Sequence, residues 1–192
     1  MVEVAQKARI VETIMLSTMM TSIVTNYQLN TLKLTVTAGE VDDFIEVLKK
    51  KFPEIYFEVS YYEGENKANY LESLVENDEA GDIIFHVKKF NNQICKEKLL
   101  DLSNYEFSAK FNESILHLMQ VEGKIYQLVG PLNFLPSIGF SSTWALNKKL
   151  CEKGNEKKLQ NALKVMSFLS TLEGQKSLQK VNPQLFVLKG ID

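Results

Sequence analysis

The sequence contains few of the residues from which catalytic and metal sites are usually built. Its 192 residues include two histidines, one tryptophan and two cysteines, Cys95 and Cys151. The cysteines form no CxxC pair and no zinc-type spacing; they could form one disulfide or remain two free thiols. No phosphate-binding loop, GxGxxG turn, GxSxG elbow or HExxH helix is present. The sequence therefore indicates no enzyme class, no metal and no cofactor.

An excess of charge of either sign is also lacking. The formal net charge is −2, with 24% charged and 45% hydrophobic residues. Nucleic-acid-binding domains usually carry a basic surface, so we expect no nucleic-acid partner. The composition is that of an ordinary globular protein, and the chain is long enough to bury a core.

Residues 1–30 do not share the regular pattern of the rest of the chain. The apolar run from Ile10 to Val24 has the length of a signal-peptide core, but it is too short to span a bilayer. Acidic residues among its flanks offset the basic ones, and no cysteine follows that could carry a lipid. We interpret residues 1–30 as a leader, which is either a degenerate export signal or an amphipathic or disordered arm.

From Thr31 onward, strand-like and helix-like segments alternate. Alternating or continuous apolar residues predict strands over 31–36, 54–62, 80–87, 123–129 and 142–146. Helical spacing predicts helices over 41–52, 65–76 and 155–169, a short helix capped by Thr171, and one with Phe107, Phe111, Ile115, Leu118 and Met119 on one side. Short connections between these segments favour an α/β fold, with a mostly parallel sheet and helices on both faces.

Polar and aromatic residues follow several of the predicted strands. In open parallel sheets, ligands bind outside the carboxyl ends of the strands. This rule selects as ligand-binding candidates Glu40, Tyr62, Glu63, His86 and Asn133. Their rings, carboxylates and amides suit a neutral polar ligand such as a sugar, although each residue alone is better explained by a structural role. Trp144 offers either a stacking face for a sugar or a core side chain.

Five phrases carry a family resemblance, and they occur in that family's order. They are "FIEVLKKKFPEIYFEVSYYEG", "AGDIIF", "LLDLS", "GKIYQLVGPLN" and "NKKLCEKGNEKKLQNALKVMSFLSTLEGQKSL". Over residues 31–192 the chain resembles family 1 extracellular solute-binding proteins, the sugar receptors of ABC importers. The resemblance implies a non-enzymatic protein that binds a carbohydrate or another small polar solute, an ABC permease as partner, and an extracellular or cell-surface location. A cytoplasmic location stays open, because the leader is weak.

The chain departs from that family at residues 137–143. Family members have two lobes, and their chain leaves the first lobe here, builds most of the second and returns. The resemblance therefore implies that residues 31–192 form a single lobe, with this junction where the second lobe would be inserted. Residues 124–129 and 142–146 should then belong to one sheet. One lobe provides only one wall of a binding cleft, so we do not expect tight binding. The alternative is a non-binding module that self-associates, or contacts the permease, through the exposed inter-lobe face.

Overall fold

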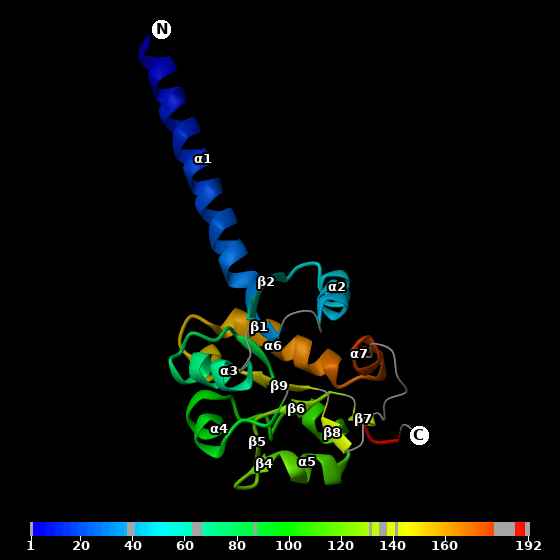
Figure 1. Cartoon of the computed structure of the whole chain (residues 1–192). Coiled ribbons are helices and arrows are strands. Elements are labelled where there is room, and N and C mark those ends of the chain that lie inside the picture. Colours follow the sequence, from blue (N-terminus) through cyan, green and yellow to red (C-terminus); the bar gives the residue numbers. More distant parts are fainter. Residues whose placement is uncertain are drawn as a thin grey trace.

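A five-stranded sheet with the strand order β2-β1-β3-β9-β6 organises the fold (Figure 1). The computed structural model describes residues 2–37, 41–62, 67–86, 88–130, 132–134, 138–140, 142–178 and 187–190. The strands of this sheet are β1 (Thr31–Thr37), β2 (Tyr56–Tyr62), β3 (Ile83–His86), β6 (Leu128–Val129) and β9 (Thr143–Leu146). β1 pairs in parallel with β2 and β3, while β9 pairs antiparallel with both β3 and β6. Four of the five strands thus run in one direction, and the predicted mostly parallel sheet is confirmed.

Both faces of this sheet are apolar. Successive strand residues point to opposite sides, and the central strands carry apolar residues on each side. The helices are α2 (Asp42–Lys51), α3 (Lys67–Glu76), α4 (Asn92–Lys98), α6 (Glu156–Leu169) and α7 (Leu172–Ser177). One face packs Phe85 and Trp144 against side chains from α2 and α6. The other packs Ile84 and Ala145 against side chains from α3 and α4. Helices therefore lie on both faces, as predicted, although α4 was not among the predicted helices.

The strand predicted over 142–146 lies inside the sheet, between β3 and β6. The strand predicted over 123–129 is divided, because β5 (Lys124–Ile125) pairs with β4 (Gln120–Val121) around Glu122 and Gly123. Those two turn residues have φ angles of 53° and 79°, which suits a tight hairpin. Only β6 continues into the main sheet, where it lies next to β9.

The helix predicted through residues 107–119 is wrong. The segment consists of a 3₁₀ turn, η1 (Glu106–Lys110), and a separate helix, α5 (Glu113–Met119). Between them Phe111 forms a bridge with Leu188, and the Asn112 N–H donates to the carbonyl of Val187. This pairing with the C-terminal segment interrupts the helix, and the Asn112 side chain then caps α5 by accepting from the Ser114 N–H.

A long N-terminal helix, a β-hairpin and a short 3₁₀ helix lie outside the main sheet and its covering helices. α1 (Val2–Asn30) is a long helix that extends away from the body, so residues 2–30 are helical rather than a disordered arm (Figure 1). No described helix is long and apolar enough to cross a bilayer. β7 (Leu132–Phe134) and β8 (Ile138–Phe140) form an antiparallel hairpin at the predicted junction, between β6 and β9. A second short helix, η2 (Lys148–Cys151), follows β9.

Candidate functional site

Four strand ends meet along one edge of the sheet, which we call the carboxyl edge. Thr37 at the end of β1 is level with Tyr62 at the end of β2. Thr143, the first residue of β9, is paired with both His86 at the end of β3 and Val129 at the end of β6. The backbone therefore places the carboxyl ends of β1, β2, β3 and β6 side by side, as the parallel arrangement requires.

The predicted site residues are only partly covered by the description. Tyr62 and His86 are the last residues of β2 and β3, and Asn133 lies in β7, which follows β6 from the same edge. Glu40 and Glu63 lie outside the described residues. Tyr62, His86 and Asn133 thus lie at the carboxyl edge or in the segment that leaves it.

Trp144 lies in the core, and its predicted role as a stacking face is not supported by its position. The side chain is 1% exposed and packs edge-on against Phe44 at 5.1 Å and Phe85 at 4.9 Å between ring centroids. Even-numbered β9 residues face the apolar layer under α2 and α6, so the ring is covered by neighbouring side chains. The alternative interpretation, a core side chain, describes Trp144 correctly.

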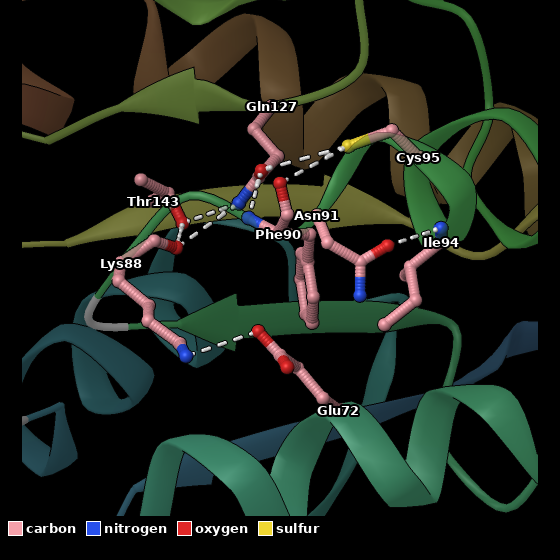
Figure 2. Close-up of polar contacts among 8 residues, drawn as sticks. All are labelled: Glu72, Lys88, Phe90, Asn91, Ile94, Cys95, Gln127 and Thr143. Carbon is pink, nitrogen blue, oxygen red and sulfur yellow. Dashed lines mark hydrogen bonds and ion pairs between the residues drawn. The ribbon is translucent and has the colours of Figure 1, made fainter.

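A buried hydrogen-bond network supports the carboxyl edge from the face that carries α3 and α4 (Figure 2). The Gln127 side chain donates from Nε2 to Thr143 Oγ1 at 2.6 Å and to the Lys88 carbonyl at 3.4 Å. Its Oε1 accepts from the Phe90 N–H at 2.8 Å, and Thr143 Oγ1 donates to the Lys88 carbonyl at 3.0 Å. The chain leaving β3 is therefore tied to both β6 and β9, which sets where that strand end lies.

Further contacts around this network hold the segment that follows β3 in place. Lys88 Nζ forms an ion pair with Glu72 of α3 at 3.1 Å, and the Asn91 side chain caps α4 by accepting from the Ile94 N–H (Figure 2). Cys95 donates from Sγ to the Phe90 carbonyl at 3.7 Å. Burial raises the pKa of the Cys95 thiol to about 11, so it stays protonated and serves as a packing residue.

A second buried amide holds the end of β6 from the opposite face. Gln175 of α7 is 1% exposed and donates from Nε2 to the Leu169 carbonyl at 2.8 Å and the Val129 carbonyl at 3.4 Å. Neither Gln127 nor Gln175 was among the residues predicted for the site. A signal existed for Gln127, because a glutamine within the otherwise apolar stretch "IYQLV" requires buried partners.

The chemistry available at the carboxyl edge is hydrogen bonding by strand ends and by polar side chains. In the described part of the chain, no three His, Cys, Asp or Glu side chains gather as metal ligands would. The buried amides of Gln127 and Gln175 donate to the backbone carbonyls of Lys88 and Val129, so they position the strand ends. Ligand contacts would have to come from the residues that follow the strands.

Comparisons with known proteins identify similar solved structures. No family model matches the chain, and no curated protein sequence matches it. The galacto-N-biose-/lacto-N-biose I-binding protein of an ABC transporter from Bifidobacterium longum is 21% identical, with a TM-score of 0.44, over 53% of this chain and 28% of that one. A family 1 extracellular solute-binding protein from Bifidobacterium longum subsp. infantis is 20% identical, with a TM-score of 0.42, over 53% and 27%.

The extracellular solute-binding protein from Staphylococcus aureus in complex with maltose is 12% identical, with a TM-score of 0.43, over 54% of this chain and 29% of that one. The chain thus spans less than a third of the length of these proteins. The matches cover about half of this chain. One of these structures has in its name the family that the sequence phrases resemble, the family 1 extracellular solute-binding proteins.

Proposed function

We propose that the chain is a one-lobe solute-binding protein that takes a carbohydrate at the carboxyl edge and serves an ABC importer at the cell surface. The observation that carries this proposal is the meeting of four strand ends at one edge, where open α/β sheets bind ligands. The five sequence phrases supply the solute class. Binding is the whole activity, and no chemical step is involved.

The placement of β9 supports a single lobe over residues 31–192. β9 pairs with β3 on one side and β6 on the other, so the sheet continues across the junction without an inserted domain. β7 pairs with β8 between β6 and β9, at the position where the resemblance implies a crossing into a second lobe. In this proposal the β7–β8 hairpin replaces the segments that would connect the first lobe to a second one.

Within the site, we assign hydrogen bonding to sugar hydroxyls to Glu40, Glu63, His86 and Asn133, and stacking to Tyr62. Trp144 is left out, because its ring is buried. One wall can bury only part of a sugar, whereas pockets that bind small ligands tightly bury ~70–90% of the ligand surface. We therefore expect a dissociation constant of about 1 mM, which corresponds to roughly −4 kcal/mol.

Chemical-shift perturbation with the isotope-labelled protein and a panel of oligosaccharides tests the proposal. Millimolar sugar should shift the amide signals of Tyr62, His86 and Val129, and His86→Ala should weaken the binding. His117→Ala is the matched control, because His117 lies in α5, outside the carboxyl edge. If no oligosaccharide shifts these signals, carbohydrate binding is refuted. A non-binding module that self-associates through this edge, or contacts the permease, then becomes the better account.

A further inference from the structure

β2 forms one end of the five-stranded sheet, so one of its two edges has no partner strand among the described residues. Its seven residues pair with β1 in an unbroken register, from Thr31 with Tyr56 to Thr37 with Tyr62. Because β1 lies on one side of the strand only, a row of backbone N–H and C=O groups points away from the sheet. Such an edge is a template on which another strand can pair.

The features that usually protect a strand edge are missing from β2. The unbroken register excludes a β-bulge, and the strand contains no proline and no lysine. Glu58 is its only charged residue. Tyr56 and Tyr61 are 46% and 48% exposed, and Phe57 and Val59 are only partly buried. Aromatic and apolar side chains therefore remain accessible at this edge.

The two faces of β2 carry different side chains. The face toward α2 and α6 carries Phe57, Val59 and Tyr61. Phe57 and Val59 pack against the core cluster there, and Tyr61 Oη donates to Asp42 of α2 at 2.7 Å. Glu58 and Ser60 alternate with these residues, so they lie on the opposite face, where both are exposed.

α1 meets β2 at the amino end of the strand. The Tyr27 ring lies 4.6 Å from the ring of Tyr56, the first residue of β2. From this contact α1 extends away from the body (Figure 1). Residues 57–61 therefore present an edge that no described strand or helix pairs with.

We propose that β2 pairs with β2 of a second copy of this chain, antiparallel and centred on Val59, so that the two sheets become one. A two-fold axis perpendicular to the sheet makes the two strands antiparallel and keeps α2 of both copies on the same face. Val59 is the middle residue of β2, so this register pairs the whole strand with itself.

The side chains that meet in this register favour a second copy as the partner. On one face Phe57 lies opposite Tyr61 of the other copy, and Val59 lies opposite Val59. On the other face Glu58 lies opposite Ser60, whose hydroxyl can donate to the carboxylate. Aromatic and β-branched pairs stabilise antiparallel strands, whereas like charges directly opposite each other destabilise them. The register therefore aligns the apolar side chains and keeps the two Glu58 side chains from facing each other.

α2 adds charges of opposite sign along the same edge. Asp42, Glu46 and Lys49 are spaced i, i+4 and i+7, so they share the side of α2 that Tyr61 contacts. α2 runs opposite to β2, because it connects the end of β1 to the start of a parallel strand. The two copies of α2 are then antiparallel, and Lys49 of one is level with Asp42 of the other. Each Glu46 is neutralised by Lys49 of its own helix, at 2.8 Å.

The length of the contact sets the strength of the pair. A strand of seven residues is roughly 23 Å long, and its pairing contributes mainly backbone hydrogen bonds. Stable specific interfaces usually bury more than about 1,000 Å², which a contact of this length does not reach. The pair should therefore be weak, and its population should depend on protein concentration.

Sedimentation velocity of the full chain, at concentrations up to about 1 mM, tests the proposal. The wild type should pass from monomer to dimer. Ser60→Lys should tighten the dimer by facing Glu58 of the other copy, and Ser60→Glu should weaken it. The two-fold axis repeats this contact, so the dissociation constants of the two variants should differ at least about tenfold.

Ser114→Lys and Ser114→Glu are the matched controls. Ser114 is exposed in α5, which contacts β6 at the other end of the sheet, so these variants should dimerise alike. The near-ultraviolet signal of Trp144 verifies that each variant is folded.

Amide signals of the isotope-labelled protein locate the contact. With rising concentration the signals of residues 57–61 should shift, while those of His86 and Val129 at the carboxyl edge should not. Three results would overturn the proposal: a wild type that stays monomeric, equal dissociation constants for Ser60→Lys and Ser60→Glu, or concentration-dependent shifts at the carboxyl edge instead of β2. The last result would assign self-association to the inter-lobe face.

Discussion

Replacing Gln127 by leucine should destabilise the protein by removing the centre of the network behind the carboxyl edge. The side chain is 1% exposed, so water cannot replace the lost partners. The Phe90 N–H loses the Gln127 acceptor, and a buried donor left in this way costs about 1–3 kcal/mol. The bond from Nε2 to Thr143 Oγ1 contributes about 1 kcal/mol more. Thr143 keeps its bond to the Lys88 carbonyl, which limits the damage.

The expected loss is therefore about 2–4 kcal/mol, which lowers the melting temperature of a chain of this size by roughly 5–15 °C. Urea unfolding followed by Trp144 fluorescence measures the loss directly. Gln93→Leu is the control, because Gln93 is an exposed residue of α4 and its replacement should change stability by no more than about 0.5 kcal/mol. Equal unfolding midpoints for the two variants would refute the view that this network holds the loop after β3.

Two further predictions concern a thiol and a carboxylate. In mildly alkaline buffer, Ellman's reagent should modify exposed Cys151 in the native protein and spare Cys95, because burial raises the pKa of Cys95 to about 11. Rapid modification of both thiols would contradict this prediction. Burial raises the pKa of Asp101. The hydrogen bonds donated by the Ser103 O–H and N–H, together with the nearby Lys124, lower this pKa by more, so the net pKa lies below its ordinary value. The ionised Asp101 side chain thus stabilises the fold at pH values above its unfolded pKa of about 3.9. Asp101→Asn should lower the free energy of unfolding near neutral pH but not in acid, where the Asp101 side chain is protonated. A loss of stability that persists in acid would refute this role of Asp101.

The first half of the fold could be predicted because its signals are local. Alternating apolar residues in β1 and helical spacing in α2 each define a buried side, and Pro53 ends the helical segment. The convergence of the strand ends followed from the parallel arrangement. By contrast, residues 107–119 have helical spacing, yet the bridge between Phe111 and Leu188 divides them. Nothing in that local pattern encodes a partner so far along the chain.

In the candidate site, too, local features could be predicted and long-range contacts could not. Its location at the strand ends was predictable, whereas the network of Gln127, Thr143 and Lys88 was not, because its members come from three separate segments. For Trp144 the sequence favoured a core role but left a ligand-stacking role open, and the packing against Phe44 and Phe85 decided between them. An isolated aromatic residue does not specify which surface will cover it.

The sequence by itself determined the α/β class and which side of each early strand and helix is buried, because apolar periodicity follows directly from backbone geometry. Only the tertiary structure decided that β9 enters the sheet antiparallel, between β3 and β6. Only the tertiary structure decided that α1 extends from the body with apolar side chains such as Met19 and Ile23 exposed (Figure 1). Both outcomes depend on which distant surfaces meet, and backbone hydrogen bonds and apolar burial select those partners only when the whole chain has folded.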